Sequence, residues 1–380
     1  MINRNRIPAV YMRGGTSKGL VFHRRDLPAD RAEWDGIFLG AMGSPDPYGR
    51  QLDGMGGGTS TLSKVCIVEP ASRDGFDVDY TFAQVSVKQA KVDYGSICGN
   101  MSAAVALFAQ QEGLVPTGSQ QTAVRIFNTN TKKALRATLD IGNGAPPVRG
   151  LMGIPGVAGE APPVRLDFID PAGAMTGKLL PTGNARDTLR IPAYGSMAVS
   201  LIDAGTSCVF IDAGALGLEG SELPSEISTR AEVVALVEQA RRHASVAMGL
   251  APDIEAAAAK PVAPFVCVIA PAMDSGTLSG AAIAVHDVDF TVRAFANGQP
   301  HLALPITASL CCAVAAEVEG SLLDAILGAN RQNTSSLRIG MPSGILNVAA
   351  SLDKGGGRIR VHSASLYRTA RRLFDGFVYA

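Results

Sequence analysis

Hydrophobic positions along the chain come mostly in short runs that are β-branched or alternate with polar residues. Glycine, proline and aspartate interrupt these runs at short intervals, a pattern typical of β-strands joined by turns. The clearest predicted strands are 8–12, 65–68, 78–82, 85–87, 123–127, 135–139, 164–168, 196–201, 208–211, 265–269, 283–285 and 359–362. The pattern therefore predicts a protein built mainly of β-sheet.

Three segments have the length and spacing of helices. Residues 101–112 and 306–318 are apolar on nearly all sides, so we expect each helix to be surrounded by other structure. Residues 230–248 have an apolar side and a charged side, which predicts an amphipathic helix on the outside of the protein. The segment 365–374 fits either a helix or a strand.

The same order of elements occurs twice: strands, one buried helix, and more strands. This internal duplication predicts an α+β fold with two similar domains, each an all-round β structure with one central helix. We expect domains at 1–185, with its helix near 100–112, and at 186–380, with its helix near 306–318. The boundary follows the Pro-Thr-Gly-Asn segment at 181–184.

Composition narrows the classes of function. The chain of 380 residues has 34 basic and 34 acidic residues, which argues against a nucleic-acid partner. No stretch resembles a signal peptide or reaches the roughly 18 apolar residues that span a bilayer. The six cysteines have no CxxC and no Cys/His spacing typical of a metal site. We therefore expect a cytoplasmic globular enzyme that binds no metal, nucleic acid or membrane.

A glycine-rich segment, Arg13–Gly19 (Arg-Gly-Gly-Thr-Ser-Lys-Gly), directly follows the first predicted strand. Adjacent glycines let the backbone approach a ligand, and Arg13, Gly15, Thr16 and Ser17 offer donors to an anion. The spacing is not that of a Walker A loop. A plain hairpin turn explains the same residues, so both interpretations stay open.

A second glycine-rich segment spans 53–64 and ends at Lys64, which enters a predicted strand. Its glycines and hydroxyl groups again suit a carboxylate or phosphate; the candidates are Gly57, Gly58, Thr59 and Ser60. Lys64 is either a solvated charge at a strand edge or, if desolvated, a base whose pKa falls.

Cys98 has the most specific setting of any candidate. It precedes Gly99, Asn100 and Met101 where the first buried helix begins, whereas the other five cysteines have apolar surroundings. A helix N-terminus stabilises a thiolate and can bind a carboxylate. The alternative is that Asn100 or Ser102 only caps the helix beside an inert cysteine.

The second buried helix begins in a comparable way. His301 precedes it, and Thr307 and Ser309 lie in its first turn. These residues offer a second carboxylate site with His301 as acid, base or orienting group, although a single histidine is more often structural.

Together these segments resemble the PrpF family of isomerases, which includes methylaconitate isomerase, methylitaconate Δ-isomerase and 4-oxalomesaconate tautomerase. The matching stretches are 12–19, 43–48, 51–64, 77–80, 96–102, 170–184 and 341–344. The resemblance implies a diaminopimelate epimerase-like fold: two similar domains related by a pseudo-two-fold axis, each a β-barrel around a central helix, with the active site between them.

The resemblance also implies roles for individual residues. Lys64 and Cys98 correspond to the principal acid–base pair. Supporting and substrate-binding polar residues are implied at Ser17, Asp93, His301, Ser343 and Gly344. The epimerases have a cysteine at each central helix, whereas here Thr307 and Ser309 open the second one. A Lys/Cys isomerase therefore fits better than a symmetrical two-thiol racemase.

The expected function is a cofactor-independent isomerase that moves a proton and a C=C bond within a small unsaturated di- or tricarboxylate. The substrates 4-oxalomesaconate, 2-methylaconitate, aconitate and methylitaconate fit equally well, and either Lys64 or Cys98 fits as the base. A homodimer is allowed. Two alternatives stay open: a racemase or epimerase of a small carboxylic acid, and a non-catalytic accessory protein to an aconitase-like dehydratase.

Overall fold

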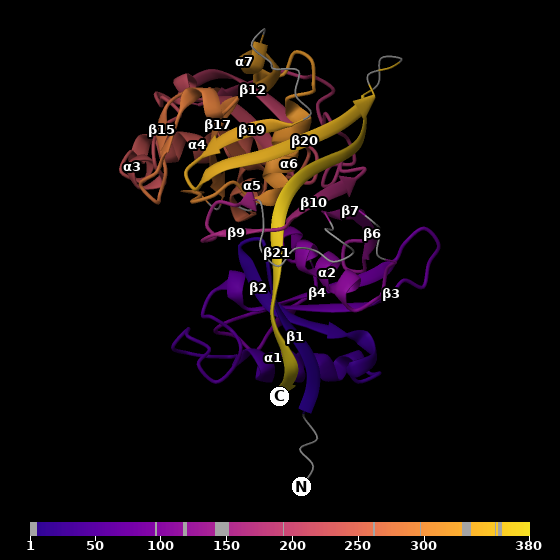
Figure 1. Ribbon diagram of the computed structural model, residues 1–380. Helices are drawn as coiled ribbons and strands as arrows, with labels where there is room; N and C mark the ends of the chain where they lie inside the picture. Colours follow the sequence, from indigo (N-terminus) through magenta and orange to yellow (C-terminus); the bar gives the residue numbers. More distant parts are fainter. Residues whose placement is uncertain are drawn as a thin grey trace. The chain divides into compact units, whose positions relative to one another are not determined.

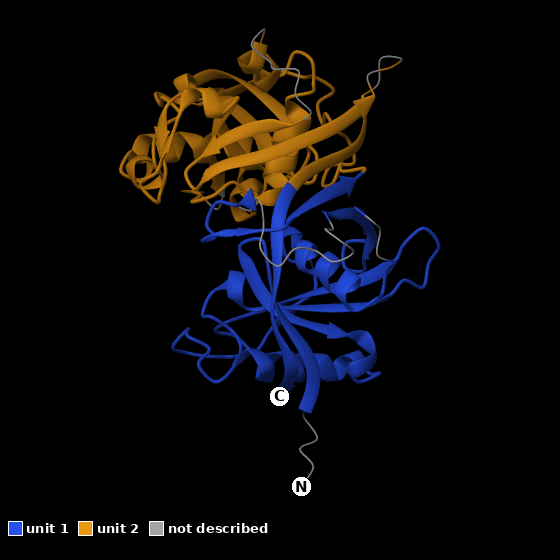
Figure 2. Cartoon of the chain, in the orientation of Figure 1, with its two compact units in different colours: residues 1–169, 367–380 blue, residues 170–366 orange. Residues whose placement is uncertain are grey.

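The chain forms two compact units (Figure 2). The computed structural model describes residues 6–95, 97–116, 120–140, 152–192, 194–260, 263–296, 298–328, 336–353, 355 and 359–380. Unit 1 comprises residues 1–169 and 367–380, and unit 2 comprises residues 170–366. The sequence had suggested a single boundary at 185. The units differ from that division because the last strand, β21 (Arg360–Tyr379), runs on from unit 2 and pairs along β1 (Arg6–Gly14) of unit 1.

Unit 1 is a closed barrel of eight strands. The strands follow one another around it in the order β1, β2, β3, β4, β6, β7, β10 and β21, which returns to β1. The strands not yet given are β2 (Ser17–His23), β3 (Lys64–Pro70), β4 (Val78–Val85), β6 (Gln121–Asn128), β7 (Lys133–Asp140) and β10 (Pro163–Ile169). Three short strands also belong to this unit: β5 (Val92–Asp93), β8 (Met152–Gly153) and β9 (Glu160–Ala161).

Helix α2 (Gly99–Gln111) lies at the centre of this barrel (Figure 1). Residues 101–110 are all buried, because side chains from every strand of the barrel surround the helix. Strand residues of alternating position, such as Cys66, Tyr80 and Phe82, point inward and pack against it. The helix ends where Gly113 adopts φ 68° and donates to the carbonyl of Gln110, a conformation that glycine reaches without strain.

The outer face of the barrel is covered by helix α1 (Trp34–Met42). Its Trp34 and Phe38 pack against the outward residues of β2 and β3. Two apolar layers, one inside and one outside the sheet, explain why β2 and β3 read as continuous apolar runs rather than alternating ones.

Unit 2 has a comparable sheet and central helix. Its strands pair in the order β11, β12, β13, β14, β17, β19, β20 and the first part of β21. Helix α6 (Ile306–Ala315) contacts β12, β13 and β20, and α4 (Ala231–Ala247) covers β11 and β14. The strand bounds are β11 Asp187–Ile191, β12 Gly195–Asp203, β13 Ser207–Asp212, β14 Phe265–Pro271, β15 Ser275–Gly276, β16 Ala282–Ile283, β17 Phe290–Ala296, β18 Gln299–Pro300, β19 Leu337–Met341 and β20 Gly344–Asp353. The shorter helices are α3 (Pro224–Ser228), α5 (Ile254–Ala259) and α7 (Leu322–Leu327).

Most predicted elements are confirmed, and a few boundaries were wrong. Helix α6 stops at Ala315 rather than 318, because the chain tightens into i→i+3 bonds before Gly320 (φ 80°). The predicted strand 85–87 is only the end of β4, and 283–285 is half strand and half 3₁₀ turn. The segment 365–374 is strand, within β21.

Candidate active site

The glycine-rich segment after β1 is a two-residue hairpin. Gly14 pairs with Ser17, which leaves Gly15 and Thr16 as the loop. The N–H of Gly15 donates to the carbonyl of Thr369 at 2.8 Å. The hairpin interpretation is therefore the one seen in the structure, and the Gly15 N–H is already used within the protein.

This hairpin packs directly on the first turn of α2. A Cβ atom on Gly14 would lie 3.0 Å from the Cα of Met101, and one on Gly15 would overlap the side-chain amide of Asn100. Asn100 Nδ2 donates to Thr16 Oγ1 at 3.1 Å. Only glycine at both positions permits this approach, and at Gly15 φ is also +51°.

The N-terminus of α2 has no side-chain cap. Cys98 is the N-cap residue, and it is the only cysteine of the six that is not buried. The backbone N–H groups of Gly99, Asn100 and Met101 have no acceptor among the residues that the structure describes, whereas Ser102 N–H donates to Cys98 O at 2.9 Å. The capping alternative is wrong, because Ser102 Oγ bonds the Cys98 carbonyl and Asn100 bonds Thr16. Ser96, two residues before Cys98, lies outside the described residues.

Two buried side chains lie beneath Cys98. The Cys66 thiol donates to Tyr80 Oη at 3.7 Å, and this hydroxyl lies against the backbone of Cys98. Burial, followed by the neighbouring thiols Cys66 and Cys98, raises the pKa of the Tyr80 phenol well above its usual range. Tyr80 is therefore a neutral support for the start of the helix; the alternating pattern of its strand marked it only as a core residue.

Lys64 begins β3 and is buried, with 8% of its surface exposed. Its Nζ donates to Gln84 Oε1 at 2.6 Å and lies 5.0 Å from the centre of the Phe82 ring. Gln84 Nε2 donates to the carbonyls of Ser60 and Ser63, which fixes its oxygen toward Lys64. The solvated-charge interpretation is thus wrong.

The strand register places Lys64 on the inner side of the barrel wall. Lys64 and Cys66 lie two residues apart and so share the inner face of β3. Burial raises the pKa of the Cys66 thiol; Cys98 adds to this effect and Lys64 opposes it, so both groups lie near Cys66. On the next strands Gln84 lies opposite Lys64, and Asp93 opposite Gln84.

The second glycine-rich segment is an exposed loop that is partly bonded within itself. Gly58 N–H donates to Oε1 of Gln51, a buried residue that also donates to Ser63 Oγ, next to Lys64. Thr59 Oγ1 bonds Thr61 Oγ1. Gly57 and Ser60 are exposed in the same loop. Asp93 is exposed and accepts from Gly95 N–H at 2.7 Å.

The remaining predicted residues belong to unit 2. His301 is exposed, and its N–H donates to the Ala294 carbonyl at 2.7 Å. Thr307 is half-buried in the first turn of α6, while Ser309 is buried and bonds the carbonyl of Ile306. Ser343 lies in the turn between β19 and β20, and Gly344 is the first residue of β20. The buried Ser343 Oγ lacks a partner within the described ranges. A common site with Lys64 and Cys98 stays a prediction.

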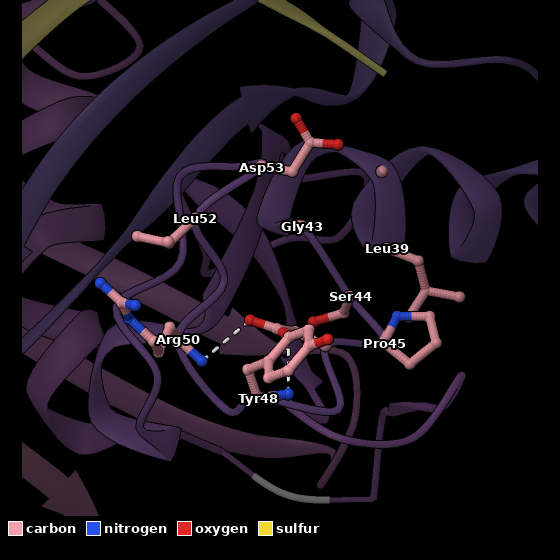
Figure 3. A pocket seen from close by; sticks show the side chains of 10 residues that line it. Leu39, Gly43, Ser44, Pro45, Tyr48, Arg50, Leu52 and Asp53 are labelled. Carbon is pink, nitrogen blue, oxygen red and sulfur yellow. Dashed lines mark hydrogen bonds between the residues drawn. The ribbon is translucent and has the colours of Figure 1, made fainter.

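A separate hollow of about 570 Å³ lies beside α1 (Figure 3). It is lined by Leu39, Gly40, Gly43, Ser44, Pro45, Asp46, Tyr48, Arg50, Leu52 and Asp53, none of which is a predicted site residue. Asp46 accepts from the backbone N–H groups of Tyr48 and Arg50, bonds that lower the pKa of its carboxyl. Its carboxylate is therefore committed to the loop.

Two features are absent from the described part of the chain. No group of three or more His, Cys, Asp or Glu side chains there is arranged to hold a metal ion. No helix there is long and apolar enough to cross a membrane.

A barrel around a central helix, with a cysteine at the helix N-cap, agrees with the fold expected for an isomerase of the epimerase-like class. The family described as PrpF protein matches residues 4–380, and the chain belongs to this family. It is 37% identical to the 2-methyl-aconitate isomerase of Cupriavidus necator, over 98% of this chain and 96% of that protein.

Solved structures agree with this assignment. A methylitaconate-delta-isomerase is 38% identical, with a TM-score of 0.92 over 99% of this chain and 95% of that one. A hydroxyproline epimerase from Agrobacterium vitis, 13% identical, has a TM-score of 0.50 over 100% of this chain and 94% of that one, a likeness of fold alone. The predicted fold class and the prediction of an isomerase are confirmed.

Proposed function

We propose that this isomerase moves a proton, and with it a C=C bond, within a small unsaturated di- or tricarboxylate such as 2-methylaconitate or 4-oxalomesaconate. Lys64 and Cys98 act as the acid–base pair, and no cofactor takes part. The observation that carries the proposal is the uncapped start of α2, where a half-buried thiol adjoins three N–H groups that have no acceptor among the described residues, in the same unit as the buried Lys64.

The chemistry follows from the substrate. A C–H bond next to a C=C bond and a carboxylate is acidic, because removal of its proton gives a dienolate that spreads the charge onto oxygen. Free N–H groups at a helix N-terminus stabilise such developing negative charge. One of Lys64 and Cys98 removes the proton and the other supplies one at the distant carbon. The order of the two roles stays open.

The buried position of Lys64 supports this role. Its only hydrogen-bonded neighbour within the described residues of unit 1 is the neutral Gln84 side chain, so no described carboxylate of that unit forms an ion pair with it. A general acid or base contributes about 10²–10⁴-fold to a rate, and loss of either residue should be severe.

The racemase alternative has less support. It needs a second thiol or base at the start of α6, but the N-cap there is Pro305, and Cys311 and Cys312 are buried further along the helix. The accessory-protein alternative predicts that Lys64 and Cys98 are dispensable. A cytoplasmic location and a homodimer remain predictions.

The test is proton NMR in D₂O with 2-methylaconitate, methylitaconate, aconitate and 4-oxalomesaconate. We expect double-bond migration with deuterium uptake on at least one acid, and a loss of at least about 10²-fold in Lys64→Ala and Cys98→Ala. Lys133→Ala, an exposed lysine of β7, and Cys312→Ala, a buried cysteine of unit 2, are the matched controls and should retain activity. No exchange by the wild type on any acid, or full activity in both site variants, would refute the proposal.

A further inference from the structure

Three arginine side chains are almost fully buried in the described part of the chain: Arg241, Arg293 and Arg368, with 2%, 1% and 7% of their surfaces exposed. A buried charge is costly unless a partner compensates it. The three arginines differ in whether they have such a partner.

Two of these arginines are compensated. Arg241 donates to both oxygens of Glu238, at 2.7 and 2.8 Å, and to three backbone carbonyls. Arg293 donates to the carbonyls of Glu222, Val292 and Gly340, and lies near the carboxylates of Glu222 and Glu226. Both arginines therefore have carboxylates nearby, although Arg293 Nη2 has no hydrogen-bond partner within the described residues.

Arg368 has no such compensation. Its Nε donates to Asn100 Oδ1 at 3.0 Å and its Nη1 to the carbonyl of Tyr367 at 2.9 Å. Every Asp and Glu of unit 1 is described, and none forms an ion pair with it. Burial alone lowers the pKa of this guanidinium to about 10. Of its five N–H donors, three lack an acceptor among the described residues of unit 1.

The Arg368 guanidinium lies at the start of helix α2. Asn100 is the second residue of α2, so the guanidinium contacts a side chain of the first turn of that helix, where three N–H groups have no acceptor among the described residues. Its Cδ lies 3.1 Å from where a Cβ on Gly15 would be, at the hairpin tip. A helix N-terminus carries positive partial charge. The Arg368 guanidinium and the N-terminus of α2 are thus two neighbouring positive groups with no described carboxylate of unit 1 between them. A bound carboxylate would interact favourably with both.

We propose that Arg368 binds one carboxylate of the substrate, together with the free N–H groups at the start of α2. Asn100 and the Tyr367 carbonyl hold the guanidinium on one side, which leaves Nη2 and the second hydrogen of Nη1 for the two carboxylate oxygens. The inference rests on the proposed function in one respect: it takes the substrate to be a polycarboxylate.

The test uses tricarballylate, a saturated tricarboxylate that has no double bond to move. Its Kd is measured by calorimetry, and Tm with and without it, for wild type, Arg368→Met, Arg368→Lys and Arg241→Met. We expect Arg368→Met to weaken binding by about 10- to 100-fold, with Arg368→Lys in between because it keeps the charge but loses the fork.

Stability separates binding from a structural role. Without ligand, Arg368→Met should lower Tm less than Arg241→Met does, because removal of an unpaired buried charge offsets the loss of the hydrogen bond to Asn100. Arg241→Met should lower Tm, because it leaves Glu238 unpaired, and should leave Kd unchanged. A wild-type Kd in Arg368→Met, a Tm loss there as large as in Arg241→Met, or no binding of tricarballylate by the wild type would each overturn the inference.

The outcome is separable from that of the proposed function. Arg368-dependent binding of tricarballylate by a wild type that exchanges no proton would refute the isomerase proposal and support the carboxylate site. Isomerisation by a wild type whose Arg368→Met variant keeps the same KM and Kd would do the reverse.

Discussion

Replacing Gly15 by alanine should lower the free energy of unfolding for two reasons, backbone strain and a steric overlap, which can be measured separately. The residue has φ +51°, and a residue with a Cβ pays about 1–2 kcal/mol in this left-handed conformation. The new Cβ would also overlap the Asn100 side chain, whose Cγ lies 2.7 Å from the ideal Cβ position. Asn100 must therefore move.

Movement of Asn100 breaks its bonds to Thr16 Oγ1 and from Arg368 Nε. Each is worth about 0.5–1.5 kcal/mol, so their loss adds about 1–3 kcal/mol. Gly15→Ala should then lower the free energy of unfolding by roughly 2–5 kcal/mol. Activity should fall as well, because the displaced side chain belongs to the first turn of α2.

The double variant Gly15→Ala/Asn100→Ala measures how much of the loss in stability comes from the bonds of Asn100. Asn100→Ala alone loses the same two bonds, about 1–3 kcal/mol. In the double variant those bonds can be lost only once, so it should be no less stable than Gly15→Ala. The two single effects should then exceed the double effect by about 1–3 kcal/mol.

The assay is urea-induced unfolding followed by circular dichroism, with Gly36→Ala as the matched control. Gly36 lies in helix α1, and an added Cβ there meets nothing within 4 Å. The same substitution should stabilise the protein at that site by up to about 1 kcal/mol. Strictly additive effects of Gly15→Ala and Asn100→Ala would refute the steric account, and so would a loss below about 0.5 kcal/mol in Gly15→Ala.

Two further predictions concern single side chains. Because Cys98 is the one cysteine that is not buried, one thiol of the native protein should react quickly with iodoacetamide, and no thiol should do so in Cys98→Ala. Mass spectrometry of the labelled protein measures this. Two or more fast-reacting thiols in the native protein would contradict the prediction. The hydrogen bond from Arg125 lowers the pKa of the Asp77 carboxyl, so this pair stabilises the fold above the unfolded-state pKa of about 4 and loses that effect as the pH falls through the lower folded-state pKa. Asp77→Asn should therefore cost about 1 kcal/mol or less at pH 7 and less as the pH falls through the folded-state pKa, and an unfolding difference that does not shrink as the pH is lowered would contradict this.

The fold could be predicted from the sequence because its strongest constraints are local. Residues 101–110 are apolar on nearly all sides, so burial of this helix needs structure around it. The β-branched runs on either side supply that structure. The position of one helix end could not be predicted, because the i→i+3 bonds that close α6 depend on packing rather than on an obvious terminating residue.

The site could be predicted only where one short segment carries its chemistry. Cys98 and its Gly-Asn neighbours identify the start of α2 without any knowledge of the rest of the chain. Tyr80 and Arg368 carry no such signal. Tyr80 has the pattern of an ordinary core residue of a strand. Arg368 becomes a candidate only through its hydrogen bond to Asn100, which lies 268 positions away in the sequence.

The path of the last strand explains why that pairing was beyond sequence analysis. β21 lies between β1 and β10 and closes the barrel of unit 1, so its residues face groups fixed near the beginning of the chain. The carbonyl of Thr369 accepts from Gly15, and Arg368 donates to Asn100. The C-terminal segment thus contacts both the hairpin and the start of α2. A division of the chain at one point between two domains separates these residues, whereas the closed barrel requires them together.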